Sequence, residues 1–253
     1  MRAIAVIPAR YGSTRFPGKP LALIQGRPVI QHVYENAAKA QEISRVIVAT
    51  DHSDIFSAVK SFSGEARMTS ADCPSGSDRV AEVARNLDCD IIVNIQGDEP
   101  LLTSAMIDAT VTILKNCGGS IGTLAKKIEK KVEIRNPNTV KVVFDRYGKA
   151  LYFSRSPIPF YRDVFLPDGT FPDAALSSVV LYKHIGIYSY WKETLLQLTK
   201  LPPSNLENIE KLEQLRALEN GFAIYVALTE SDTIGIDTPE DLERVKQWLS
   251  SSS

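Results

Sequence analysis

Short apolar runs alternate with amphipathic segments along most of this chain. Runs rich in aliphatic and β-branched residues predict buried strands at residues 4–7, 46–49, 91–95, 120–127, 183–190 and 224–228, with a further short strand ending at Met68. Between the earlier runs, apolar residues recur every three or four positions, which predicts helices over residues 28–37, 53–59, 77–87 and 104–115. Because strands that alternate with helices form parallel sheets covered by helices, we expect an α/β fold with a mostly parallel central sheet.

A basic loop follows the first apolar run, which is stopped by Pro8. Its cations and glycines are Arg10, Gly12, Arg15, Gly18 and Lys19. Glycines let a backbone bend closely around a ligand, and fixed cations suit a polyanion, so the loop is a candidate triphosphate cradle. It is not a Walker A loop, because its two glycines are one residue too far apart and a proline follows the lysine. The alternative is a basic surface loop that only connects a strand to a helix.

Two acidic residues follow predicted strands. Asp98 comes after residues 91–95, beside Gln96 and Gly97, and Asp237 comes after the last predicted strand. If both strands belong to one sheet, both carboxylates emerge at one edge. Magnesium prefers oxygen ligands and needs only one or two carboxylates from a protein. Asp98 could instead cap a turn, and Asp237 could simply favour the amino end of the last helix.

Two further helices are marked by their first residues. Ser204 and Glu207 have the spacing of a capping box. The helix that they start is expected to bury Leu206, Ile209, Leu212, Leu215 and Leu218. The last helix is expected to have Thr238 as its N-cap and Pro239 at its first position.

Composition limits the classes of function. The 253 residues are 44% hydrophobic and carry a formal net charge of −1, so no overall field favours nucleic acid or an anionic membrane. The three cysteines form no C-x-x-C pair, which fits reduced thiols in a cytoplasmic protein. No apolar run is long enough to span a bilayer, and Pro8 and Arg10 interrupt the only early apolar run. We therefore expect neither membrane insertion nor a signal peptide.

The opening loop resembles the signature of a known family. Ile7-Pro8-Ala9-Arg10 and Pro17-Gly18-Lys19-Pro20-Leu21 are similar to motifs of the sugar-activating cytidylyltransferases, and among them of the 3-deoxy-manno-octulosonate cytidylyltransferases. Later segments extend this resemblance over nearly the whole chain. It implies a Rossmann-like fold of the nucleotide-diphospho-sugar transferase type, with CTP and 3-deoxy-D-manno-octulosonate (Kdo) as substrates. It also implies Mg²⁺ as cofactor, CMP-Kdo as a product for lipopolysaccharide biosynthesis, and a homodimer.

The resemblance implies residues for the nucleotide and the metal. The family's N-x-QGDEP motif stands at residues 94–100 and its D-T-P-E-D motif at residues 237–241, which carries the magnesium ligands over to Asp98 and Asp237. Arg10 and Lys19 are assigned to the CTP phosphates and, with these two acids, to catalysis. The implied nucleotide site consists of Pro8, Ala9, Arg10, Lys19, Ser75, Gly76, Ser77, Gln96 and Asp98. The chain departs from the family at Ser70 and Cys73, where Arg and His are common.

A second set of residues is implied for the sugar acid. It consists of Gln96, Arg155, His184, Tyr188, Glu213 and Gln214. Arg155 is expected to pair with the Kdo carboxylate, since a planar guanidinium holds a carboxylate in two hydrogen bonds. Otherwise it is a surface arginine after a hairpin. His184 and Tyr188 match the family's H-x-G-x-Y pattern, and alternation puts them on one face of a strand.

We interpret residues 1–249 as a single domain and residues 250–253 as a disordered tail. Residues 140–190, with a predicted hairpin and a Pro-rich loop over 157–172, are interpreted as a β-rich insertion and dimerisation region. Leu151, Phe153 and Ile158 are the expected apolar contacts of that interface.

Three alternative functions remain open. A CMP-sialic acid synthetase shares the opening motif but typically has Lys at the position of Thr14 and Asn at that of Pro20. Sugar-1-phosphate nucleotidyltransferases use a more glycine-rich opening loop. An alternative of another class is a non-catalytic nucleotide-binding regulator on the same fold, against which both Asp98 and Asp237 argue.

Overall fold

A single nine-stranded sheet forms the centre of the molecule. The computed structural model describes residues 1–12, 15–166, 171–172, 176 and 179–251. The strands are β1 (Ala3–Ala9), β2 (Leu23–Ile24), β3 (Arg27–Pro28), β4 (Ile43–Thr50), β5 (Ala66–Met68), β6 (Ile91–Asn94), β7 (Ile121–Lys127), β8 (Lys141–Phe144), β9 (Ala150–Ser154), β10 (Tyr182–Trp191) and β11 (Ile224–Leu228). The helices are η1 (Lys19–Leu21), α1 (Val29–Ala38), α2 (Ser53–Ser61), α3 (Gly76–Ala84), α4 (Ser104–Cys117), α5 (Lys131–Arg135), α6 (Lys192–Leu198), α7 (Asn205–Glu210), α8 (Gln214–Glu219) and α9 (Pro239–Ser251).

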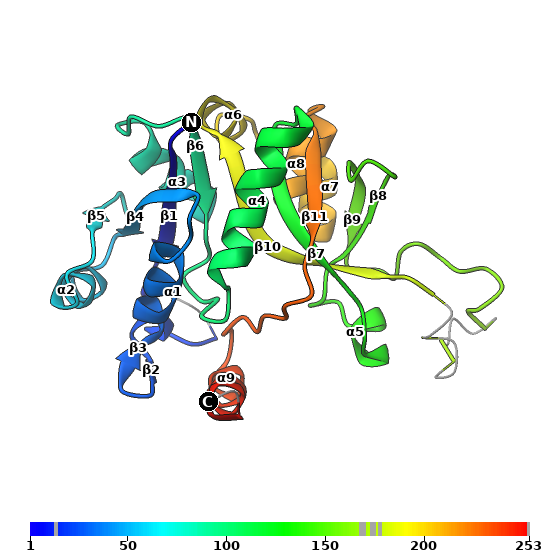
Figure 1. Cartoon of the computed structure of the whole chain (residues 1–253), viewed down its shortest axis with the longest axis horizontal. Helices are drawn as coiled ribbons and strands as arrows, with labels where there is room; N and C mark the ends of the chain where they lie inside the picture. The colour runs from blue at the N-terminus through cyan, green and yellow to red at the C-terminus, as the bar shows by residue number, and fades with distance from the viewer. Residues whose placement is uncertain (13–14, 167–170, 173–175, 177–178, 252–253) are drawn as a thin grey trace.

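The main path of this sheet has the order β11-β7-β10-β6-β1-β4-β5, with β8 and β9 attached through β10 (Figure 1). Strand β10 runs antiparallel to both of its neighbours on that path, β6 and β7. The other pairs along the path are parallel. The prediction of a mostly parallel central sheet is therefore confirmed, and the carboxyl ends of β1, β4 and β6 meet at one edge.

The sheet is covered by helices on both faces. Along β1, Ala3, Ala5 and Ile7 belong to one apolar cluster, whereas Ile4 and Val6 belong to another. Helices α1, α2 and α4 pack on the first face, and α3, α6 and α8 pack on the second. A strand buried on both faces has to be apolar throughout, which explains the continuous run at the start of the sequence. Within the described residues, no helix is long and apolar enough to cross a membrane.

Strand β1 continues past the proline that was expected to stop it. Pro8 pairs with Ala49 and Ala9 pairs with Thr50 of β4, whereas the pairing with β6 ends at Val6. A residue without an N–H is tolerated there because one side of β1 is no longer part of the ladder. The extension carries the basic loop beyond the end of β6.

The boundaries of the predicted β-rich insertion change in the structure. Strands β8 and β9 form the expected hairpin, and β8 pairs with the start of β10. Strand β10, however, lies in the main sheet between β7 and β6, so residues 140–190 include a strand of the core. Part of the Pro-rich segment, residues 167–170, lies outside the described residues. The tail prediction is wrong at its start, because α9 extends to Ser251.

The predicted long helix after Ser204 is two short helices. The capping box is confirmed: the Ser204 hydroxyl accepts from the Glu207 N–H, and the Glu207 carboxylate accepts from the Ser204 N–H at 2.9 Å. Lys211 then takes a left-handed conformation, with φ of 53°, and ends α7. The helical period is lost at this point, so Ile209 is 69% exposed and not buried as predicted.

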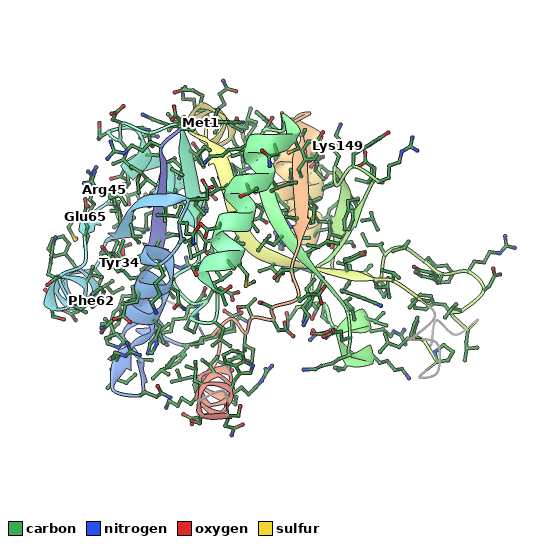
Figure 2. All side chains as sticks on the ribbon, in the orientation of Figure 1. Met1, Tyr34, Arg45, Phe62, Glu65 and Lys149 are labelled. Carbon is green, nitrogen blue, oxygen red and sulfur yellow. The ribbon has the colours of Figure 1, made fainter. Side chains whose placement is uncertain are left out.

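Side chains hold Glu65, the residue before the edge strand β5, to the neighbouring elements. Arg45 holds the Glu65 carboxylate in two hydrogen bonds of 2.6 and 2.5 Å, and the Glu65 N–H donates to the Tyr34 hydroxyl. The Tyr34 ring also contacts that of Phe62, and all four residues lie together at one end of the molecule (Figure 2). These contacts fix the start of β5 against β4 and α1.

We expect Ser204→Ala to lower the free energy of unfolding by about 1 kcal/mol, because the Glu207 N–H loses its capping acceptor. Urea denaturation measures this change. Ser250→Ala is the control: its exposed hydroxyl donates only to a carbonyl within α9, and we expect a change within about 0.5 kcal/mol. Equal stability of the two variants would contradict a stabilising role for the capping box.

Candidate active site

A cavity of about 510 Å³ opens at the edge where β1 and β6 end. Its walls are formed by the loop after β1, the turn before α3, the segment after β6 and Asp237. Its lining residues are Pro8, Ala9, Arg10, Arg15, Lys19, Pro20, Cys73, Pro74, Ser75, Gly76, Arg79, Gln96, Gly97, Asp98 and Asp237. Cations and acids from segments far apart in the sequence therefore meet in one concave surface.

Lys19 joins the two acids of this cavity. Its ammonium group contacts the Asp98 carboxylate and lies 3.3 Å from Oδ1 of Asp237. Arg15 contacts the other oxygen, Oδ2 of Asp237, at 2.9 Å. A positive charge between two carboxylates removes their repulsion, so the ammonium stands where a divalent cation could sit.

Two glycines bring these groups together. Gly18 has φ of 71°, and its N–H donates to the Tyr11 carbonyl at 2.9 Å, which folds the loop back just before Lys19. Gly97 lies against β1, since a Cβ there would come within 2.9 Å of the Pro8 carbonyl oxygen. A side chain at Gly97 would push the segment that carries Asp98 away from the loop.

The turn before α3 forms the opposite wall. The Ser75 hydroxyl caps α3 by accepting from the Asp78 N–H at 3.1 Å, and Gly76 follows as the first helical residue. Arg79, one turn further on, is buried and donates to the Asp51 carboxylate at 2.7 Å. Hydrogen bonds therefore hold this wall together, and the amino end of α3 and the guanidinium of Arg79 both lie in it.

A second, smaller cavity of about 50 Å³ lies beside the first. Its lining residues are Ser77, Asn94, Gln96, Ile121, Tyr188, Tyr190, Leu198, Glu213, Gln214 and Ala217. Gln96 lines both cavities and donates to the Asn94 amide oxygen at 3.2 Å. Burial raises the pKa of the Glu213 carboxyl, so this cavity offers a partly desolvated carboxyl group next to hydroxyl and amide groups.

Comparison with known proteins identifies the family. The cytidylyltransferase family model matches residues 4–230. A 3-deoxy-manno-octulosonate cytidylyltransferase of Thermodesulfovibrio yellowstonii is 54% identical over 100% of both chains. This chain belongs to the 3-deoxy-manno-octulosonate cytidylyltransferase family. A member from Geobacter metallireducens is 51% identical over 99% of this chain and 98% of its own.

Solved structures agree with this membership. A CMP:2-keto-3-deoxy-manno-octonic acid synthetase complexed with CTP is 40% identical, covers 100% of both chains and has a TM-score of 0.90. A 4-diphosphocytidyl-2C-methyl-D-erythritolsynthase of Anaerococcus prevotii is 16% identical over 98% of both chains with a TM-score of 0.62, which shows a common fold alone.

The structure brings most residues implied by the family resemblance into the two cavities. The larger cavity contains all the predicted nucleotide-site residues except Ser77, which lines the smaller one. Of the predicted sugar-site residues, Gln96, Tyr188, Glu213 and Gln214 line the smaller cavity. The roles of these residues stay predictions.

His184 lies beside the smaller cavity without lining it. Its Nε2 is 2.9 Å from the Thr123 hydroxyl, and its ring contacts those of Phe153 and Tyr188. The last contact, with ring centroids 5.3 Å apart, confirms that His184 and Tyr188 share one face of β10. Burial lowers the pKa of His184 to about 3, so its imidazole is neutral at pH 7.

Arg155 is not brought to either cavity. Its guanidinium donates to the backbone carbonyls of Glu210 and Pro137, each at 2.7 Å, and of Lys211 at 3.2 Å. The last carbonyls of a helix lack partners within the helix, and Arg155 supplies donors where α7 ends. In this structure the side chain therefore joins the loop before β8 to the junction of α7 and α8.

Some lining residues were not among the predicted site residues. Cys73, Pro74 and Arg79 line the larger cavity, as does Arg15, which the sequence offered as a cation of the basic loop but which was not assigned to the site. The segment Ser75-Gly76-Ser77-Asp78-Arg79, which is similar to the family's S-G-[ST]-[ED]-R motif, offered a signal for Arg79. No periodic signal marks the others, since they lie on loops.

We expect Arg155→Ala to lower the free energy of unfolding by about 1–3 kcal/mol, because three carbonyls lose a charged donor. Urea denaturation measures the loss. Arg85→Ala, which removes an exposed arginine at the end of α3, is the control and should stay within about 0.5 kcal/mol. Unchanged stability of Arg155→Ala would contradict the structural role and favour the sugar-binding hypothesis.

Proposed function

We propose that this protein is a 3-deoxy-manno-octulosonate cytidylyltransferase, which converts CTP and Kdo into CMP-Kdo and diphosphate. The observation that carries the proposal is the pair Asp98 and Asp237, joined by Lys19 inside a cavity rich in cations. This constellation suits a triphosphate with a divalent metal, and it occurs in a chain similar to named Kdo cytidylyltransferases along its whole length.

The larger cavity would hold CTP. We propose that Arg10, Arg15 and Lys19 face the triphosphate, and that the turn at Ser75 and Gly76 faces the base or ribose with its backbone N–H groups. Among the described residues none bonds the Arg10 guanidinium, so it can turn toward a phosphate without losing a partner. A cavity of about 510 Å³ lies within the usual range for a small-molecule site.

Asp98 and Asp237 would hold Mg²⁺. Both can contact a single cation, as their contacts with Lys19 demonstrate. Within the described part of the chain no group of three or more His, Cys, Asp or Glu side chains could hold a metal, so phosphate and water oxygens would complete the shell. When bound, magnesium would supply positive charge that offsets the negative charge on the transferring phosphoryl group. Lys19 would then turn to the diphosphate that leaves.

The sugar acid would lie next to Gln96, between the two cavities. In the proposed reaction the anomeric hydroxyl of Kdo attacks the α-phosphorus of CTP and loses its proton to solvent. The bond from the α-phosphorus to the oxygen that bridges it to the β-phosphorus breaks, and diphosphate leaves with that oxygen. The chain's residues act by positioning the reactants and by neutralising charge, without a covalent intermediate. A cavity of about 50 Å³ is too small for a whole octulosonate, so Tyr188, Glu213 and Gln214 would contact it only in part, or move apart.

The partner of the Kdo carboxylate stays a prediction. The resemblance assigns it to Arg155, which would have to leave the three carbonyls that it bonds. Arg79 lines the larger cavity and is the alternative cation, although Asp51 already binds it.

The alternative of a CMP-sialic acid synthetase is distinguished in sequence by two positions. Pro20 is part of η1, where a proline is accommodated at the start of a helix. Thr14, the other position, lies outside the described residues. No specific observation favours this alternative.

We further propose that the enzyme acts in the cytoplasm as a homodimer and supplies lipopolysaccharide synthesis. The described cysteines are free, as expected of a reducing compartment. Of the apolar residues expected at the interface, Leu151 is 61% exposed and available, whereas Phe153 is buried inside the chain and is excluded. Phe160, which is 63% exposed, offers a further apolar surface in the same region.

Release of diphosphate from CTP tests the proposal. With magnesium present we expect release with Kdo and little with sialic acid or without a sugar acid, because the cavity must orient an acceptor hydroxyl. Release with sialic acid alone would favour the synthetase alternative. Tight CTP binding without release for any 2-keto sugar acid would favour a non-catalytic regulator.

We expect Asp98→Asn and Asp237→Asn each to lower the rate of transfer by about a hundredfold, because an amide binds magnesium poorly and does not neutralise it. Steady-state kinetics at limiting magnesium measures this effect, and circular dichroism checks the fold. Asp54→Asn, on the exposed first turn of α2, is the control with an unchanged rate. A full rate in either site variant would remove that residue from the mechanism.

A further inference from the structure

The two acids of the active site reach it from opposite parts of the sheet. Asp98 lies in the short segment after β6, whereas Asp237 follows β11, which is separated from β6 by β7 and β10. Adjacent strands lie about 4.8 Å apart, so the chain must cross about 14 Å along the sheet edge after β11 ends. Figure 1 shows this segment running from β11 to α9. We call residues 229–236 the crossing segment.

The crossing segment bonds the strands in the order in which it passes them. Thr229 donates to Ala125 of β7 at 3.0 Å. Asp232 then pairs with Lys183 of β10 at 2.8 Å and with Lys126 of β7 at 3.8 Å. These bonds guide the first half of the segment, but they end before it reaches Asp98.

The second half meets the segment after β6 at Glu99. The Thr233 hydroxyl donates to Oε2 of Glu99. Gly235 lies against the same carboxyl group, where a Cβ would come within 3.0 Å of Oε1. One residue later, the Ile236 N–H donates to the Asp98 carbonyl at 2.9 Å, and the Ile236 side chain is fully buried. Asp237 is the next residue.

We propose that Glu99 is a positioning residue that fastens the crossing segment beside Asp98 and thereby sets the distance between the two metal-binding carboxylates. Glu99 is not a catalytic residue, since it does not line either cavity. Its neighbour Asp98 does, so the two adjacent carboxyl groups divide the tasks: one faces the cavity and the other faces the segment that brings the second acid. The inference rests on the proposed function in assigning Asp237 to the metal.

Amide hydrogen exchange of the ligand-free protein tests whether Glu99 holds the crossing segment in place. Glu99→Ala should speed the exchange of residues 229–238 by about tenfold or more, because Thr233 loses its acceptor and the segment loosens. Glu99→Gln keeps an acceptor oxygen of the same reach and should stay within about threefold of the wild-type rate. Glu65→Ala is the control: it removes a paired carboxylate at the β5 edge and should leave this segment unchanged.

Binding of Mn²⁺, followed by its electron paramagnetic resonance signal without CTP or Kdo, tests the consequence for the metal. Glu99→Ala should weaken Mn²⁺ binding by about 10- to 100-fold, as expected when a residue that orients a metal ligand is lost, and Glu99→Gln should restore most of it. In transfer kinetics Glu99→Ala should lower kcat and raise the magnesium requirement, with the KM for Kdo within about twofold.

Thr233→Val tests the hydrogen bond between Thr233 and Glu99 while leaving the Glu99 carboxyl group in place. It removes the donor and keeps the volume, so it should change exchange and Mn²⁺ binding in the same direction as Glu99→Ala. The double variant should add little to either single variant, because both remove one interaction. Additive effects would contradict the proposed contact.

Two results would overturn the inference. Wild-type exchange of residues 229–238 in Glu99→Ala would show that Glu99 does not fasten the segment. Equal loss of Mn²⁺ affinity in Glu99→Gln and Glu99→Ala, with normal exchange in both, would make Glu99 a metal ligand instead. Failure of the wild type to release diphosphate would reject the proposed function alone, because the exchange measurement needs no substrate or metal.

Discussion

Repulsion between two carboxylates is the constraint around which the rest of this site is arranged. Two like charges about 4 Å apart near a protein surface repel by about 4 kcal/mol, which exceeds the net contribution of most single hydrogen bonds. Asp98 and Asp237 share one cavity, and the ammonium group of Lys19 lies between them and offsets their repulsion. The left-handed turn at Gly18 is what brings Lys19 to this place.

The topology of the sheet makes this pairing demanding. Because β10 is inserted antiparallel between β6 and β7, the strand that leads to Asp237 lies three positions away from the strand that leads to Asp98. The same reversal places the first residues of β10 at the carboxyl edge of the parallel strands, which brings His184 close to the cavities. The antiparallel direction of β10 thus brings predicted sugar-site residues to the cavities. Its position between β6 and β7 also lengthens the path from β11 to Asp237.

The sequence predicted the fold well where its signal was local. Continuous apolar runs located the strands, the helical period located α1 to α4, and capping residues located the starts of α7 and α9. The errors have physical causes that sequence periodicity does not contain. Pro8 stays in β1 because the ladder beside it has ended, and the helix after Ser204 breaks because Lys211 adopts a left-handed conformation.

For the site, sequence motifs identified residue types but not the route by which they meet. Adjacent segments such as Gln96 to Asp98 could be placed at a sheet edge from the strand before them. For Asp237 the sequence predicted this edge only on the condition that both strands share one sheet, and its position depends on bonds from the crossing segment to β7, to β10 and to the segment after β6. Contacts of this kind join residues far apart in the sequence, such as Thr233 and Glu99, and leave no pattern in the sequence around either partner.

The cations of this protein differ in what already binds them, and this difference separates structural from functional charge. Arg155 and Lys141 donate to backbone carbonyls around the loop at residues 136–139, and burial lowers the pKa of Lys141 to about 8. Moving either side chain would leave carbonyl groups without a donor. Lys19, by contrast, contacts carboxylates that a divalent metal could neutralise in its place, so it can turn to a phosphate at little cost. Residue type alone predicts the same role for all of these cations, and only their hydrogen-bond partners distinguish them.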